Sequence, residues 1–172
     1  MKNGHYKQIT EIGLGQVINF FYFKGINYLE REFKKGRDLD NPVAIIIKGT
    51  SKMTVALEDM SKEEYVARLK VACHFIEADA IMIFSEASNW TGTMEEMKNV
   101  KEMMGQIHGH VKAVDVLHVL IETQGKRIIG VADIESKGNK RVMKSMKWHV
   151  VDLPEEQECL FSHFLPNQKE AA

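Results

Sequence analysis

Cysteine and proline are scarce in this chain of 172 residues, and neither sign of charge is in excess. Cys73 and Cys159 lie far apart without metal-ligand spacing, so the sequence predicts neither a disulfide framework nor a structural zinc site. A formal net charge of -1 gives no overall reason to bind nucleic acid or a membrane surface. The first residues lack the apolar core of a signal peptide, and no apolar run reaches the roughly 20 residues that span a bilayer. We therefore expect a cytoplasmic protein with no membrane partner.

The composition that remains, 44% hydrophobic and 27% charged, is that of an ordinary globular protein. Its length suits a single domain, and no repeat or linker divides residues 1–172. Apolar residues at helical spacing predict a long first helix over about residues 14–36, although Gly25 inside it is unfavourable by about 1 kcal/mol relative to alanine. A sheet-and-helix core is expected over about residues 42–165.

Short β-branched or alternating runs predict the strands, which are residues 43–47, 53–57, 80–84, 114–123, 126–134 and 141–151. The clearest pair is joined by Gly125, which suits a two-residue turn, and its register places Leu117 opposite Ala132 and Glu122 opposite Arg127. The last strand is expected to carry four apolar side chains on one side, namely Val142, Met146, Trp148 and Val150.

Two capping boxes, Ser61 with Glu64 and Thr93 with Glu96, mark the starts of two further helices. The resulting order is helix, hairpin, helix, strand, helix, hairpin, strand. This order predicts an α+β fold of the two-layer type, in which a mostly antiparallel sheet of five to six strands has its helices packed on one face.

A strand motif that begins Ala-Asp-Ala and ends Ser-Glu-Ala occupies residues 78–87, after a capped helix and before a hairpin. It resembles small, uncharacterised bacterial and phage α/β proteins in which a similar strand ends in Ser-Glu-Ala-Trp. The resemblance covers about residues 43–134. Here Ser88 and Asn89 precede Trp90, and a helix is inserted before the hairpin. The resemblance implies the same kind of fold and a phage or mobile-element origin, and it implies no chemistry.

Three of the seven histidines could form a metal site. His108 and His110 are two residues apart, and His118 follows on the next strand, with Glu122 or Asp133 as a carboxylate. A metal-dependent hydrolase or nuclease would also need an open position for water and a general base. In the alternative, the first two histidines lie in a loop and His118 packs on a half-exposed sheet face. Because no metalloenzyme motif occurs, we predict no metal and no cofactor.

Glu86, at the end of a predicted strand, could act as a general acid or base, with His118 and Asp133 as further catalytic candidates. The alternative is a polar strand end beside Trp90 as a core anchor. No motif supplies a nucleophile with a partner, so the sequence assigns no catalytic residue.

A run of cations without an acid ends in an aromatic residue: Lys140, Arg141, Lys144, Lys147 and Trp148. Such a run could contact a phosphate backbone and stack on a base. Lysines also protect an edge strand from aggregation, and acidic residues follow directly. We therefore expect nucleic-acid binding to be weak or absent.

Aromatic residues crowd most sides of the first helix, and the candidates for self-association are Phe20, Phe21, Phe23 and Tyr28. They present more apolar surface than one small sheet needs, so a homodimer is the economical explanation. A position between the sheet and a neighbouring helix would hide them equally well. The methionines of the third predicted helix suit either an adaptable interface or a core. We favour a binding or accessory protein that acts by protein–protein contact, with a metal-dependent hydrolase or nuclease as the alternative.

Overall fold

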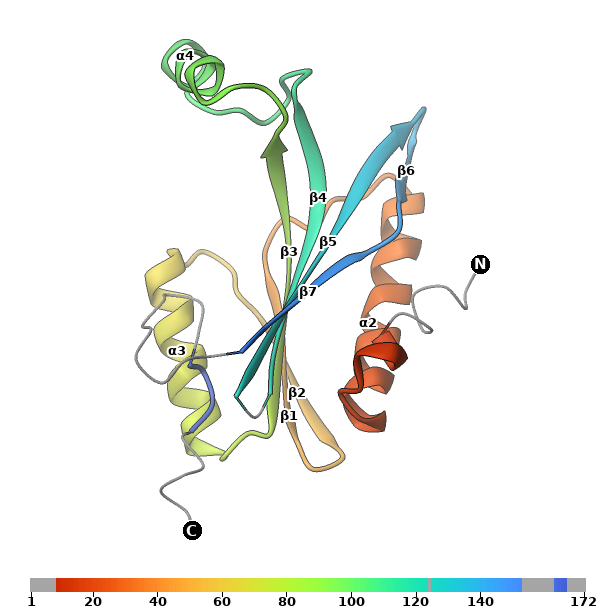
Figure 1. Cartoon of the computed structure of the whole chain (residues 1–172), viewed down its shortest axis with the longest axis vertical. Helices are drawn as coiled ribbons and strands as arrows, with labels where there is room; N and C mark the ends of the chain where they lie inside the picture. The colour runs from red at the N-terminus through yellow and green to blue at the C-terminus, as the bar shows by residue number, and fades with distance from the viewer. Residues whose placement is uncertain (1–8, 124, 153–162, 167–172) are drawn as a thin grey trace.

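The computed structural model describes residues 9–123, 125–152 and 163–166. Two helices, α2 (Gln16–Lys34) and α3 (Lys62–Phe75), flank an antiparallel sheet, and a third, α4 (Met94–Met104), lies beyond one end of it (Figure 1). The strands are β1 (Val43–Lys48), β2 (Ser51–Ala56), β3 (Ala80–Trp90), β4 (Ala113–Thr123), β5 (Lys126–Lys137), β6 (Lys140–Met143) and β7 (Lys147–Asp152). The predicted α+β class is confirmed.

The sheet has seven strands in the order β2-β1-β3-β4-β5-β6, and β7 also pairs with β5. The predicted β4–β5 hairpin is confirmed in its register, with Leu117 opposite Ala132 and Glu122 opposite Arg127. Gly125 in the turn has a φ of 78°, which glycine adopts without steric cost. The sheet therefore follows the predicted antiparallel pattern with one or two more strands than expected.

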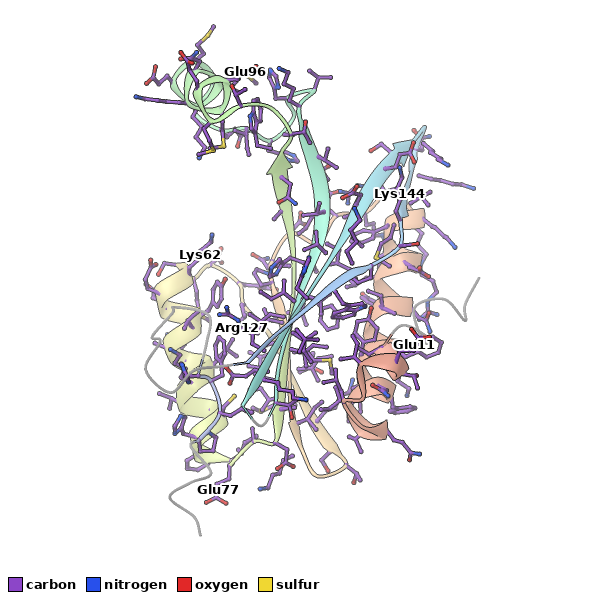
Figure 2. All side chains as sticks on the ribbon, viewed as in Figure 1. Glu11, Lys62, Glu77, Glu96, Arg127 and Lys144 are labelled. Atoms are coloured by element: carbon purple, nitrogen blue, oxygen red, sulfur yellow. The ribbon has the colours of Figure 1, made fainter. Side chains whose placement is uncertain are left out.

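The two helices that flank the sheet lie on opposite faces, so the expectation of helices on one face is wrong (Figure 1). Ile45 and Met82 pack in the core beneath α2, whereas Ile46 and Ile81 pack in the core beneath α3. The middle of β1 and the first half of β3 are buried at every position, as in strands covered on both sides. Side chains accordingly fill both layers, and Arg127 is among those on the α3 side (Figure 2).

α2 approaches the sheet closely at two glycines. A Cβ at Gly25 would lie 3.0 Å from the ring of Phe84, so the glycine that weakens the helix lets this ring pack against its backbone. Gly36, with a φ of 80°, follows the helix, and a Cβ there would lie 2.5 Å from the carbonyl oxygen of Asn139. The end of α2 therefore rests directly against the turn between β5 and β6.

The strand predicted over residues 141–151 is two strands that both pair with β5. β6 ends at Met143 opposite Ile134, and β7 begins at Lys147 opposite Val131. Residues 144–146 therefore lie opposite only two residues of β5, 132–133, which is a β-bulge. The extra residue inverts the alternation of side chains from there on. The side chains on the α2 face are consequently Arg141, Met143, Met146 and Trp148. Val142 lies on the other face, so the prediction that it shares a side with Trp148 is wrong.

Cys73 lies buried in the core beneath α3. Burial, together with the charge of Glu122, raises the pKa of its thiol to about 12, so the thiol is protonated and unreactive at neutral pH. Cys159 lies outside the described residues. Among the described helices, none is both long enough and apolar enough to cross a membrane.

Candidate functional site

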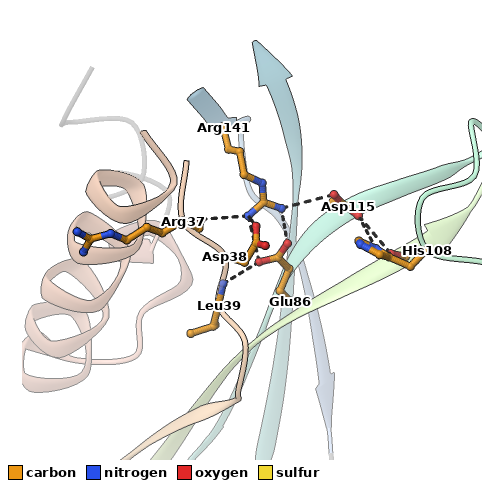
Figure 3. Close-up of polar contacts among 8 residues, drawn as sticks. Arg37, Asp38, Leu39, Glu86, His108, Asp115 and Arg141 are labelled. Atoms are coloured by element: carbon orange, nitrogen blue, oxygen red, sulfur yellow. Dashed lines mark hydrogen bonds and ion pairs between the residues drawn. The ribbon is translucent and has the colours of Figure 1, made fainter. Parts of the chain in front are cut away.

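A polar cluster occupies the end of the sheet that lies beyond the α2 core (Figure 3). On the α2 face of β3, the apolar residues Met82 and Phe84 are followed by Glu86 and then Ser88. Asp115 of β4 lies opposite Ser88, and β6 brings in Arg141 on the same face. The alternation that builds the core thus places polar side chains together where the core ends.

Arg141 is the centre of this cluster, and only 8% of its surface is exposed. Its Nη2 donates to Oε1 of Glu86, and its Nη1 lies 3.2 Å from Oε2 of the same carboxylate. Nη1 is also 2.7 Å from Oδ1 of Asp38, and Nη2 is 3.5 Å from Oδ2 of Asp115. The guanidinium carbon lies 5.2 Å from the ring centre of Phe33 on α2. We call Arg141 and its three carboxylates the Arg141 network.

The Arg141 network joins four parts of the chain that are distant in sequence. Glu86 also accepts a hydrogen bond of 2.9 Å from the amide of Leu39, in the segment that follows α2. Burial by itself would lower the pKa of Arg141, but hydrogen bonding and charge from Glu86, with Asp38 and Asp115, raise that pKa above its ordinary value. The guanidinium is therefore permanently charged and balances a buried carboxylate.

Ser88, His108 and Asp115 meet beside the network. The Oγ of Ser88 lies 3.0 Å from Nδ1 of His108 and donates to Oδ1 of Asp115 at 3.2 Å. The same Asp115 oxygen is 3.3 Å from the same histidine nitrogen. A serine nucleophile would need its hydroxyl on one ring nitrogen and the carboxylate on the other. The three groups therefore form a hydrogen-bonded cluster without the geometry of a catalytic triad.

A cavity of about 190 Å³ opens beside these groups, and it is lined by Asp38, Leu39, Asp40, Glu86, Ala87, Ser88, His108 and Asp115. Four of the lining residues are acidic, and Arg141 balances one charge. The lining suits hydrogen-bond donors or a cation and disfavours a phosphate or another anion. Within the described part of the chain, no group of three or more histidine, cysteine, aspartate or glutamate side chains is placed to hold a metal ion.

The three histidine candidates do not converge. His108 contacts Ser88 on the α2 face, whereas the Nδ1 of His110 accepts from the amide of Lys112. His118 lies opposite Ser85 and Val131, and this alternation places it on the α3 face. Burial lowers the pKa of His118, which favours the neutral ring.

The catalytic candidates are likewise divided by the sheet. Asp133 lies opposite Val116, on the face that carries His118, and it is exposed. Glu86 lies opposite Leu117, on the other face. The sheet separates Glu86 from the other two candidates, so the three cannot act on one substrate.

The basic run does not form one surface either. Arg141 is buried in its network, and Trp148 packs edge-on against Tyr22 with ring centres 5.3 Å apart, so neither is free to contact nucleic acid. The exposed members are Lys140, Lys144 and Lys147, of which Lys144 lies 3.5 Å from Glu135. The bulge in this strand is what turns the arginine and the tryptophan inward.

The aromatic residues of α2 divide between core and surface. Phe21 is buried and Phe23 packs against the core beneath α2, so Phe21 is unavailable for self-association. Phe20 and Tyr28 are 51% and 56% exposed, and the ammonium of Lys24 lies 4.7 Å from the Phe20 ring centre. The exposed aromatic stripe is half the size that the sequence suggested.

Sequence reasoning missed Asp38 and Asp115 as partners of Arg141. A signal for Asp115 was present, because the hairpin register places this charge on the same face as the buried Leu117 and Val119. A charged residue in an otherwise apolar alternation indicates a buried partner of opposite charge. No comparable signal marks Asp38, which reaches the network through the turn after α2.

Comparisons with protein-family models, with curated proteins and with solved structures find no match to this chain.

Proposed function

We propose that this is a binding or accessory protein that acts by protein–protein contact, with α4 as its contact element. The observation that carries the proposal is that none of the residues of α4 is buried. Met94 and Met103 are 74% and 87% exposed, and Met104 is also exposed. The helix stands beyond both cores (Figure 2). Exposed methionines suit an adaptable protein interface.

The sequence around α4 nevertheless specifies a helix. The Oγ1 of Thr93 accepts from the amide of Glu96 at 3.2 Å, and Gly105 ends the helix with a φ of 76°. At its base, Trp90 donates to the Thr93 carbonyl at 2.8 Å, and Lys112 forms an ion pair with Glu96. A helix of 11 residues is marginal in water without packing, so a partner that covers its apolar side would stabilise it.

A second copy of the chain is the partner that the charges of α4 favour. One exposed side of α4 carries Met94, Glu95, Met97, Lys98, Lys101 and Glu102. Because this side of the helix carries both signs of charge, a two-fold contact can set the lysines of one copy against the glutamates of the other. Phe20 and Tyr28 of α2 are a smaller second candidate for self-association.

Sedimentation equilibrium at micromolar concentration tests the proposal. We expect a dimer for the natural chain and a monomer for the Met94→Glu/Met104→Glu double variant. The matched control is Val71→Glu/Phe75→Glu, which removes an exposed apolar pair from α3 and should leave the dimer intact. A natural chain that stays monomeric refutes self-association. A dimer lost only with Phe20→Ser/Tyr28→Ser moves the contact to α2.

The metal-dependent hydrolase or nuclease is not favoured by the geometry, because the sheet separates His118 from His108. We also propose a cytoplasmic location, in keeping with the scarcity of cysteine. A phage or mobile-element origin rests on the strand motif of residues 78–87 alone, and the comparisons add nothing to it.

A further inference from the structure

Residues 163–166 lie against the sheet on its α3 side, far in sequence from the elements that they contact. Phe164 is 0% exposed and belongs to the core beneath α3, together with Leu69 and Leu120. The ammonium of Lys70 on α3 lies 5.7 Å from the centre of the Phe164 ring. The space between α3 and the sheet, which we call the α3 groove, is therefore filled in part by one aromatic side chain from a distant segment.

Glu122 of β4 fixes the backbone of the same segment. Its carboxylate is buried, with 2% of the residue exposed, and its Oε2 accepts from the amide of Leu165 at 2.9 Å. The backbone amides of His163 and Phe164 lie near enough to this carboxylate to offset part of the rise in its pKa that burial causes. His163 has a φ of 58°, in the left-handed region. A left-handed residue bends the backbone so that successive N–H groups can point toward one anion.

The contact has one unfavourable feature on the sheet and one on segment 163–166. Among the described residues, Oε1 of Glu122 has no hydrogen-bond partner although it is buried. His163 holds a left-handed conformation that a residue with a side chain rarely adopts. Residues 163–166 form neither helix nor strand, so no backbone ladder adds to the ring and the carboxylate. A segment held in this way can exchange without unfolding the sheet.

We propose that the α3 groove is a peptide-binding site that recognises a phenylalanine together with the backbone amides around it, and that the chain's own residues 163–166 are its resting occupant. The external ligand is a peptide segment of a protein partner with the same chemistry, an aromatic residue followed by an apolar residue and proline. The ring packs in the α3 groove, and Glu122 accepts a hydrogen bond from a backbone amide, which a peptide of any sequence can donate. The inference is independent of α4 and of the function proposed for it.

A synthetic peptide of residues 162–168, labelled with a fluorophore at its amino end, tests the proposal by anisotropy. The receptor is the full chain with Phe164→Ala, which leaves the groove intact and weakens its own occupant. We expect saturable binding to this variant and binding at least tenfold weaker to the natural chain, because a tethered occupant competes at an effective concentration of about millimolar. The peptide with alanine in place of its phenylalanine should not bind.

A second receptor variant, Leu165→Pro, keeps the test valid if Phe164→Ala fails to fold. Leu165→Pro removes the amide that donates to Glu122 and deletes no buried ring, and it should bind the peptide as Phe164→Ala does. Adding Glu122→Gln to Phe164→Ala keeps an acceptor oxygen without the charge and should weaken binding about tenfold, the size expected for losing one charged hydrogen bond. The Met94→Glu/Met104→Glu variant of the α4 proposal should leave binding to Phe164→Ala unchanged.

Two results would overturn the proposal. One is that folded Phe164→Ala and Leu165→Pro both bind the peptide no better than the natural chain. The other is that the natural chain forms a dimer that Phe164→Ala abolishes while the peptide does not bind. That outcome would mean that segment 163–166 is exchanged between copies of the chain and that the groove does not take a partner's peptide.

Discussion

Replacing Arg141 by methionine keeps an apolar stem over Phe33 but leaves Glu86 and Asp115 without their shared cation. The Arg141 and Glu86 side chains are 10% and 12% exposed, so this is a buried ion pair. Removing one partner of such a pair costs about 3–5 kcal/mol, because the other charge stays buried. Asp38 is 61% exposed, so water can solvate it once Arg141 is gone. We therefore expect Arg141→Met to lower the free energy of unfolding by about 3 kcal/mol, the lower end of this range.

Urea unfolding followed by circular dichroism measures this cost as a change in midpoint at constant slope. The matched control is Lys144→Met on the same edge of the sheet, because the pair of Lys144 with Glu135 is exposed and should contribute less than about 1 kcal/mol. The double variant Arg141→Met/Glu86→Leu removes the more buried of the two orphaned carboxylates and should be more stable than Arg141→Met alone. The reasoning is refuted if Arg141→Met costs no more than Lys144→Met, or if the double variant is less stable than the single one.

Three further predictions concern the rest of the fold. Burial raises the pKa of Glu122 above its ordinary value of 4.5, so the folded chain binds this proton more tightly than the unfolded chain. Stability should fall as the pH rises from about 4.5 through the folded pKa, and urea midpoints across this range should show that Glu122→Gln lacks this part of the decline. A Cβ at Gly130 would lie 2.7 Å from the ring of Trp148, so Gly130→Ala should cost about 1–3 kcal/mol and shift the tryptophan fluorescence; an unshifted spectrum at unchanged stability would contradict the close packing. Ser61→Ala should cost about 1 kcal/mol of global stability, whereas Thr93→Ala should increase hydrogen exchange in α4 and leave the global midpoint nearly unchanged, because α4 buries none of its residues.

Local signals predicted the elements well, because the interactions that define them lie within a few residues. Ser61 accepts from the amide of Glu64, and Thr93 does the same for Glu96, as the two capping boxes require. Gly125 permits a tight turn, and the turn length then sets the whole β4–β5 register. Two elements differ from the prediction. The strand expected over residues 80–84 continues to Trp90, so Glu86 lies inside it and not at its end. The strand expected over residues 141–151 contains a bulge that periodicity cannot reveal, because the alternation changes phase within it.

The sequence by itself determined the secondary structure, the antiparallel pairing and the apolar faces of the strands, because capping, turn geometry and alternation act over short distances. The tertiary structure alone decided which distant groups meet. Arg141 reaches Glu86 only because the bulge turns it toward α2 and because Gly36 lets the end of α2 rest against the β5–β6 turn. Glu122 accepts a hydrogen bond from the amide of Leu165, 43 positions away, at a site that no local pattern marks. Such contacts depend on the packing of whole layers, which is a property of the folded chain.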